Sequence, residues 1–144
     1  MIDVSPLVEA DRADWERLFQ SYLGFYGRTG SPELFDAKWP IFLTGKDMLA
    51  RIARVDGQVA GFTHFFSHPN ASGPDDCYLQ DLYTDPEVRG KGVGRALIQA
   101  VADWAAEQGC GRVYWHTQQT NAVAQVLYNK VAVNDFRLRY VIDL

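Results

Sequence analysis

The stretch from Asp85 to Leu97, DPEVRGKGVGRAL, places the strongest constraint on how this chain can fold. It follows an apolar run, CYLQDLYT, and precedes a segment in which Val93, Leu97, Val101 and Trp104 recur at helical spacing. A strand that ends in a glycine-rich turn and opens a helix presents unpaired backbone N–H groups at the positive end of the helix dipole. The sequence therefore predicts a strand, a phosphate-binding loop and a helix.

Further elements are predicted on both sides of this unit. After the helix ends near Gly109, the apolar run at 112–117 predicts a strand parallel to 77–84, joined to it by a right-handed crossover. Residues 48–55 and 58–66 flank Asp56-Gly57 and predict a hairpin. The other predicted elements are an edge strand at 2–8 ended by Pro6, a helix within 10–27 capped by Asp11, a helix from Ser31-Pro32 that ends by Pro40 or soon after, a helix at 121–130 with Val123, Val126 and Leu127 facing inward, and a last strand at 135–144.

Length and composition indicate one domain over residues 1–144. The chain has 144 residues, of which 47% are hydrophobic and 13% aromatic, enough for one core. No run approaches the eighteen or so apolar residues of a membrane span, and the first residues lack the pattern of a signal peptide. We therefore expect a cytoplasmic protein of the α/β (α+β) class without a membrane partner.

Charge and metal-ligating residues exclude several classes of function. A net charge of −4 disfavours a general nucleic-acid binder and mildly favours a cationic substrate. Cys77 and Cys110 are far apart in the sequence and are expected to be reduced thiols. His64 and His68 lie in a predicted strand at a spacing that does not bring them side by side, so no metal site is expected.

Spacing separates the known glycine loops. A Walker A loop needs Gly-Lys-Ser/Thr, but Lys91 is followed by Gly92, and the Rossmann pattern G-x-G-x-x-G fails from both Gly90 and Gly92. The pyrophosphate loop of the GNAT superfamily, Q/R-x-x-G-x-G/A, matches in full at RGKGVG. The segments YLQDLYTDPEVRGKGVGRALI and VYWHTQQTNAVAQVLYNKVA also resemble the two central motifs of that superfamily. The resemblance covers about 55–140 and is strongest to diamine acetyltransferases and to yeast histone and polyamine acetyltransferases.

The resemblance implies a fold and an activity. The fold would be the GNAT fold, a mixed and mostly antiparallel sheet with helices on both faces and a V-shaped opening between two central strands. The activity would be direct transfer of an acetyl group from acetyl-CoA, the cosubstrate, to a primary amine of a small molecule or a peptide lysine. A homodimer is also implied. One alternative is a non-catalytic acyl-CoA-binding regulatory module, and another is a nucleotide-binding protein of the Rossmann type.

The resemblance also implies which residues bind the cofactor. Backbone groups of Leu82, Tyr83 and Thr84 would pair with the pantetheine arm like an added strand. Asn121, at the start of the next helix, would contact the same arm. The pyrophosphate would lie in the loop formed by Arg89, Gly90, Lys91, Gly92, Val93, Gly94 and Arg95, where glycine permits close approach and the arginines add charge. The alternative interpretation of that loop is a helix-opening turn with solvated basic residues.

Tyr128 matches the tyrosine that is proposed, in members of the family, to act as general acid toward the coenzyme A thiolate. The alternative is that Tyr128 is a core residue, as tyrosines on amphipathic helices often are. The diamine enzymes carry Glu-Asp where this chain has Gln80-Asp81, and a glutamine cannot accept a proton. Asp81 is the candidate base, but strand alternation turns it away from Gln80, so it could be structural.

Substrate selection in this fold usually involves the first two helices and their connection. Tyr22, Phe25 and Tyr26 are the aromatic candidates there, with Glu33 and Asp36 as possible carboxylate partners and Gln80 as a further substrate contact. Aromatic rings next to carboxylates could hold an amine by cation–π and ionic contacts. The same residues could equally be core and solvated surface.

Overall fold

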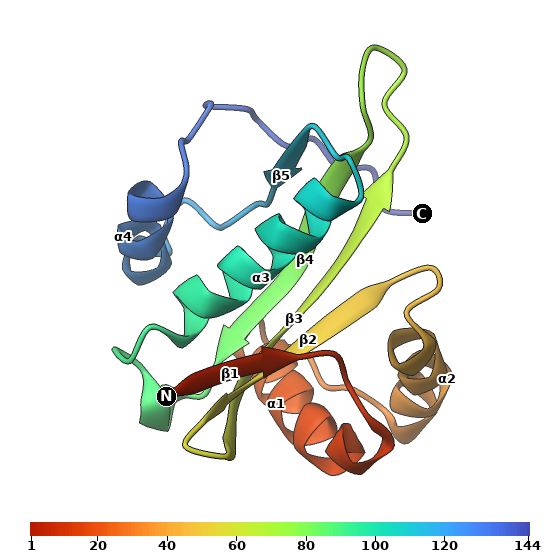
Figure 1. Ribbon diagram of the computed structural model, residues 1–144, viewed down its shortest axis with the longest axis vertical. Coiled ribbons are helices and arrows are strands. Elements are labelled where there is room, and N and C mark those ends of the chain that lie inside the picture. Colours follow the sequence, from red (N-terminus) through yellow and green to blue (C-terminus); the bar gives the residue numbers. More distant parts are fainter.

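The computed structural model describes residues 1–144 and shows a curled five-stranded sheet with helices on both faces (Figure 1). The predicted α/β class with a mixed, mostly antiparallel sheet is confirmed. The strands are β1 (Ile2–Ser5), β2 (Leu49–Val55), β3 (Gln58–His68), β4 (Asp76–Thr84) and β5 (Arg112–Tyr114). The helices are α1 (Arg12–Phe25), α2 (Pro32–Thr44), α3 (Val93–Glu107) and α4 (Ala122–Val131), with short 3-10 turns at Glu9–Asp11 and Pro86–Val88.

The sheet follows chain order, β1-β2-β3-β4-β5. The first four strands are antiparallel, and β4 and β5 are parallel, as the β4–α3–β5 crossover requires. Asp56 and Gly57 have φ angles of 49° and 83°, so the β2–β3 hairpin closes with two left-handed residues, as predicted for an Asp-Gly turn.

A β-bulge interrupts the pairing of β3 with β4. Phe65 pairs with Leu79, whereas the preceding residue His64 pairs with Asp81, so that Gln80 is an extra residue on β4. Because side chains alternate along a strand, an extra residue changes which face the following side chains occupy. In a regular strand the side chains of Leu79 and Asp81 would lie on the same face of the sheet. With the extra residue between them, they can lie on opposite faces.

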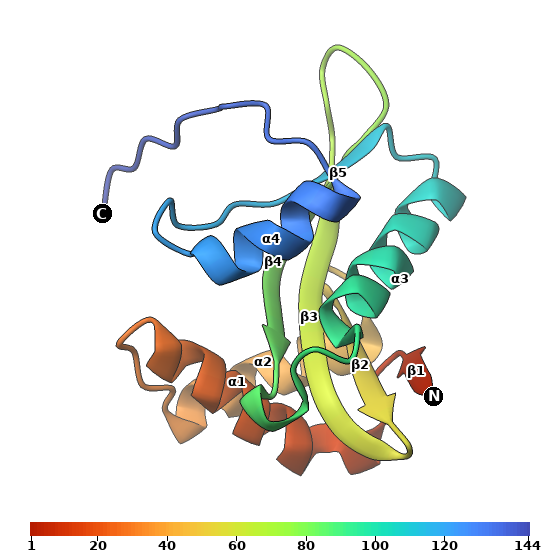
Figure 2. The same ribbon diagram turned by 90° about the vertical axis from the view of Figure 1, so that its left-hand side faces the viewer.

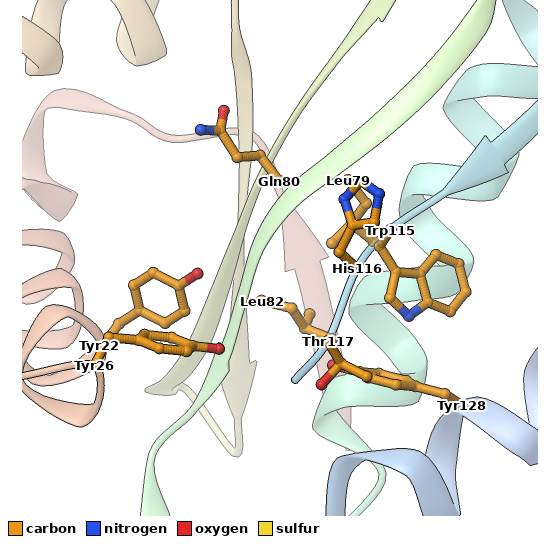
Figure 3. Close-up of a pocket in the computed structure, with 9 residues that line it drawn as sticks. All are labelled: Tyr22, Tyr26, Leu79, Gln80, Leu82, Trp115, His116, Thr117 and Tyr128. Carbon is orange, nitrogen blue, oxygen red and sulfur yellow. The ribbon is translucent and has the colours of Figure 1, made fainter. Parts of the chain in front are cut away.

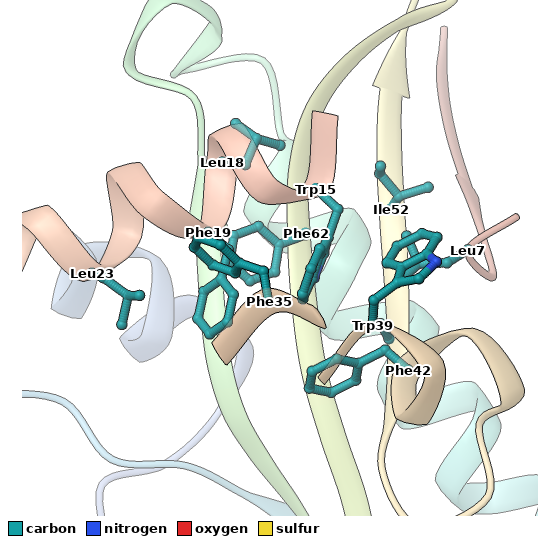
Figure 4. Packing of buried hydrophobic residues seen from close by; sticks show 11 residues of the cluster. Leu7, Trp15, Leu18, Phe19, Leu23, Phe35, Trp39, Phe42, Ile52 and Phe62 are labelled. Carbon is teal, nitrogen blue, oxygen red and sulfur yellow. The ribbon is translucent and has the colours of Figure 1, made fainter. Parts of the chain in front are cut away.

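Each face of the sheet has its own apolar core. Helices α1 and α2 pack on one face in an aromatic cluster formed by Leu7, Trp15, Leu18, Phe19, Leu23, Phe35, Trp39, Phe42, Ala50, Ile52 and Phe62 (Figure 4). Helix α3 covers the other face, where Ile98, Val101 and Ala105 pack against residues of β3 and β4 such as Phe65 and Leu79. The sheet is thus held between two layers of helices.

Helices α1 and α2 begin at the predicted N-cap residues, Asp11 and Ser31, but differ from the prediction in two details. Ser31 caps α2 as expected, accepting a hydrogen bond from the Leu34 amide at 3.1 Å, but the helix continues past Pro40 to Thr44. Phe42, beyond the proline, is buried, and this burial favours continuation of the helix. Asp11 makes no side-chain cap on α1, because its carboxylate accepts from the Val8 amide at 2.9 Å and pairs with Arg54.

The C-terminal predictions are partly wrong. Residues 133–144 form no strand, and β5 ends at Tyr114 rather than at 117. A strand needs a partner edge, and Figure 2 shows the tail running away from the sheet. On α4, Leu127 packs inward, but Val123 and Val126 are 77% and 59% exposed, contrary to the prediction. None of the helices combines the length and apolarity that a membrane span requires.

Candidate active site

The central feature of the site is the separation of β4 from β5. The two strands pair only from Asp76–Tyr78 to Arg112–Tyr114. From Leu79 to Thr84, the edge of β4 that faces α4 has no strand partner, while its other edge pairs with β3. An unpaired edge offers a row of backbone N–H and C=O groups to an extended ligand. This is the V-shaped opening that the resemblance predicted.

A small, partly open pocket lies in this opening. Its lining residues come from α1, β4, the segment after β5 and α4; they are Tyr22, Tyr26, Leu79, Gln80, Leu82, Trp115, His116, Thr117 and Tyr128. The phenol rings of Tyr22 and Tyr26 approach from one side and that of Tyr128 from the other, with their hydroxyls directed into the space between (Figure 3). Five residues predicted from the sequence thus meet in one pocket.

Tyr128 is held in this pocket by Trp115. The two rings make an edge contact with centroids 5.5 Å apart. Burial raises the pKa of the Tyr128 phenol, and the nearby Tyr26 raises it further. A phenol whose pKa is raised stays protonated at neutral pH, so Tyr128 can act as a proton donor to an atom in the pocket.

Asp81 lies behind the pocket wall rather than in it. Its Oδ2 is 2.9 Å from Nδ1 of His64, a fully buried side chain on β3. His64 Nε2 in turn accepts from the Trp15 indole N–H at 2.9 Å. Burial strongly raises the pKa of the Tyr22 phenol, and the negative charge of Asp81 raises it further. His64 is therefore a hydrogen-bonded core residue.

The glycine loop has the geometry of an anion site. Gly90 and Gly92 have φ angles of 81° and 88°, and α3 begins at the next residue, Val93. The amides from Arg89 to Arg95 donate no hydrogen bond within the chain, and the basic side chains of the loop form no ion pair. Several free N–H groups at the start of a long helix, beside cationic side chains, fit a pyrophosphate.

Other predicted residues have different surroundings. Asn121 caps α4, its Oδ1 accepting from the Ala124 amide at 3.3 Å, and its contact with a cofactor remains a prediction. Phe25 is 59% exposed and does not line the pocket; its ring packs against Tyr26. Tyr83 and Thr84 lie on the unpaired part of β4, paired with β3 on the other edge.

Four residues that line the pocket were not predicted from the sequence as site residues: Leu79, Trp115, His116 and Thr117. The last three follow β5 directly, where a parallel strand ends, and this position is the signal that could have identified them. The sequence pattern indicates that Leu79 is an ordinary core residue of β4. It lines the pocket only because β4 and β5 separate at this point.

Comparison with known proteins agrees with this geometry. The model of the Acetyltransferase (GNAT) family matches residues 14–132, which is most of the chain. The chain belongs to the GNAT family. The match spans α1 to the end of α4 and so includes every element that lines the pocket.

The relatives of this GNAT protein are N-acetyltransferases. It is 33% identical over 143 residues to the D-amino-acid N-acetyltransferase HPA3 of Saccharomyces cerevisiae, covering 96% of this chain and 89% of that protein. It is 36% identical over 95 residues to an aminoglycoside N(6')-acetyltransferase type 1 of Klebsiella aerogenes, covering 58% and 59% of the two chains. The protein is therefore an acyltransferase enzyme that acts on amines.

Solved structures share the fold over the full length. The ribosomal-protein-alanine N-acetyltransferase of Brucella melitensis biovar Abortus 2308 has a TM-score of 0.84 and 28% identity, with each chain covered completely. The structure of AAC(6')-Iy in complex with the bisubstrate analog CoA-S-monomethyl-acetylneamine has a TM-score of 0.85 at 20% identity, and the match covers 100% of this chain and 99% of that chain. The predicted GNAT fold is confirmed.

Proposed function

We propose that this GNAT enzyme transfers an acetyl group directly from acetyl-CoA to a primary amine of a small molecule or of a peptide lysine. The observation that carries the proposal is that the unpaired edge of β4 connects a glycine loop with free amides to a pocket containing a protonated phenol, Tyr128. An extended acyl-CoA needs these three features in this order: an anion site, a strand-like edge and a proton donor.

The residues of the chain divide the binding of acetyl-CoA between them. The amides from Arg89 to Arg95, together with the cationic side chains of that loop, would hold the pyrophosphate. Backbone groups of Leu82, Tyr83 and Thr84 would pair with the pantetheine arm, and Asn121 would contact it from α4. The thioester supplies an activated acetyl group at the pocket.

In the reaction, the neutral amine attacks the thioester carbonyl and forms the N–C bond. The C–S bond then breaks, and Tyr128 donates its proton to the leaving thiolate. The amine nitrogen loses one proton in the reaction, and this proton restores the phenol of Tyr128. No acyl-cysteine step is needed. Burial raises the pKa of Cys77 to about 12, and neither Cys77 nor Cys110 lines the pocket.

The substrate is proposed only as a class. The acceptors named for three relatives are D-amino acids, thialysine and aminoglycosides, and an amine is acetylated in each case. In this chain, two tyrosines and Gln80 form the wall that an amine would meet.

Thiol release from acetyl-CoA tests the proposal, using a panel of D-amino acids, thialysine, diamines, aminoglycosides and a lysine peptide. We expect release that depends on one class of amine and falls roughly 10²- to 10⁴-fold in Tyr128→Phe. Tyr140→Phe, in the exposed tail, is the matched control and should retain activity. Binding of acetyl-CoA without turnover of any amine would favour the regulatory module instead, and undiminished turnover by Tyr128→Phe would refute the general acid.

We propose further that the enzyme is a cytoplasmic homodimer in which the tail of one copy covers another. Four apolar side chains of the tail are 79–88% exposed at alternate positions, the pattern of a strand without a partner; they are Phe136, Leu138, Tyr140 and Ile142. Light scattering at micromolar concentration should give a dimer for the full chain and a monomer after deletion of 135–144. A monomeric full chain would contradict the dimer, and fractionation of cells tests the location.

A further inference from the structure

The pocket is lined by no carboxylate that could deprotonate an amine. Asp81, the predicted base, is hydrogen-bonded to the buried His64 behind the pocket wall. An alkylammonium group ordinarily has a pKa of about 10.4, so only about one amine in 10³ is neutral at pH 7 and able to attack a thioester. A proton acceptor in the pocket would therefore raise the reactive fraction by up to about that factor.

His116 is the residue of the pocket whose chemistry suits this task. It lies in the segment after β5 and lines the pocket together with Gln80 and Tyr128 (Figure 3). Histidine is the side chain that ordinarily gains and loses a proton between about pH 5 and 8. The amide of Gln80 and the hydroxyl of Thr117 do not titrate in that range, and phenols ordinarily stay protonated until about pH 10. His116 is therefore the one pocket side chain that can take up a proton near neutral pH.

The hydrogen bonding of His116 leaves one ring nitrogen available. Nδ1 lies 3.1 Å from the hydroxyl of Tyr78 on β4, and the two rings make an edge contact with centroids 5.5 Å apart. Nε2 makes no hydrogen bond within the chain. A hydroxyl accepts as well as donates, so the Nδ1–H group can donate to Tyr78 both in the neutral ring and in the imidazolium. That hydrogen bond then persists while Nε2 gains and loses a proton.

The titratable groups around His116 are phenols. Tyr114 on β5 has its ring centroid 6.1 Å from that of His116. The titratable groups across the pocket are those of Tyr22, Tyr26 and Tyr128. Burial raises the pKa of the Tyr78 phenol, and the charges of Arg139 and Asp81 act on it in opposite directions. The side chain of His116 is exposed, so a proton that it takes from a substrate can pass on to water.

We propose that His116 is the general base of the reaction: its Nε2 takes a proton from the ammonium group of the substrate, and Tyr78 is a positioning residue that holds the ring through Nδ1. This inference rests on the proposed acetyltransferase function and adds a base that lies in the pocket. An N–H bond of the ammonium group breaks as the imidazolium forms, and the neutral amine then attacks the thioester. The imidazolium gives its proton to water, which restores the base for the next turnover.

The pH dependence of turnover tests this role. With the amine identified by the panel, His116→Ala should lower kcat/KM by roughly 10²- to 10³-fold at pH 7, because only the small neutral fraction of the amine can then react. That fraction rises about tenfold for each pH unit, so the loss should shrink by about tenfold per unit between pH 7 and 9. A loss that stays constant over this range would overturn the proposal.

Added imidazole provides a second test, because a soluble base can replace a missing one. It should restore part of the activity that His116→Ala loses at pH 7, and the restoration should increase with the neutral fraction of the imidazole. Absence of any rescue would mean that His116 does not transfer the proton. His68→Gln is the matched control: His68 is hydrogen-bonded to Tyr114 and does not line the pocket, so its variant should keep the activity and pH profile of the wild type.

A double-mutant cycle tests the positioning by Tyr78. Tyr78→Phe should lower kcat/KM by roughly two- to tenfold in the wild type and should add no loss to His116→Ala, because the ring that it holds is then absent. Additive losses would contradict the positioning role. Binding of acetyl-CoA and a cooperative thermal transition confirm that each variant is folded.

The same assays separate this proposal from the acetyltransferase function on which it rests. Turnover of an amine by the wild type, combined with full activity of His116→Ala, would overturn the base and leave the acetyltransferase function standing. If the wild type binds acetyl-CoA but turns over no amine of the panel, both proposals fall.

Discussion

Lowering the pH should weaken the folded state through one residue, His64. An unfolded histidine titrates near pH 6.5, whereas burial lowers the pKa of His64 in the folded chain. Between these two pKa values the unfolded chain binds one more proton than the folded chain, so protons favour unfolding. The stability that depends on neutral His64 is therefore fully present above pH 6.5 and is lost as the pH falls below it.

The magnitude follows from linkage. If the folded pKa lies well below the window, the free energy of unfolding falls by about 1.4 kcal/mol at pH 5.5 and by about 2 kcal/mol at pH 5, relative to neutral pH. For a domain of this size, the larger value corresponds to a fall in Tm of roughly 4–8 °C. Most carboxylates titrate below this window, so they contribute little to the change.

Urea unfolding at pH 7.5, 6.5, 5.5 and 5.0 measures the effect. His64→Asn should have lower stability at neutral pH, because Trp15 and Asp81 lose a buried partner, but a flatter dependence on pH. His68→Gln is the matched control, since His68 is hydrogen-bonded to Tyr114 outside the buried core and its variant should keep the wild-type slope. The reasoning would be refuted if the His64 variant lost as much free energy of unfolding between pH 7.5 and 5.0 as the wild type, or if the wild type lost none.

Three further predictions concern the sheet, the loop and the acid. Gly61→Ala should cost about 2 kcal/mol or more in urea unfolding, because its Cβ would lie 2.6 Å from a backbone oxygen of β4, whereas Gly73→Ala, with nothing within 4 Å, should change stability by less than about 0.5 kcal/mol. Gly92→Ala should lower the free energy of unfolding by about 1–2 kcal/mol, because the residue has a positive φ, and should weaken the binding of acetyl-CoA measured by calorimetry. Gly57→Ala, at a similar φ in the hairpin, should lower the stability without changing the binding. Because the pKa of Tyr128 is raised, the pH profile of kcat should show no alkaline decline from this phenol until above about pH 10.

The elements with strong local signals could be predicted from the sequence. The Asp56-Gly57 hairpin, the Ser31 cap and the glycine loop before α3 each depend on residues close together in the chain, and all three are confirmed. Tyr128, in contrast, was predicted as a site residue by resemblance to a family motif. The pocket confirms that Tyr128 lies beside β4, but its role as general acid stays a prediction.

Elements that depend on a distant partner could not be predicted in the same way. The alternation at 135–144 indicates a strand, yet no edge of this chain pairs with it, so the segment stays without secondary structure. The helical pattern of α4 indicates an inward face but not its width, and Val123 and Val126 lie outside that face. Local pattern specifies that a face is apolar, whereas tertiary contacts decide what covers it.

The bulge at Gln80 explains why the network behind the pocket was missed. Strict alternation places Asp81 on the same face as Leu79, which packs in the core under α3. With Gln80 as an extra residue, Asp81 instead pairs with His64 and turns toward α1, the helix that carries Tyr22. A single inserted residue thus moves a carboxylate from one side of the sheet to the other, where it is hydrogen-bonded to the buried His64. Deleting Gln80 should therefore remove the carboxylate partner of the buried His64 and lower the free energy of unfolding measured in urea.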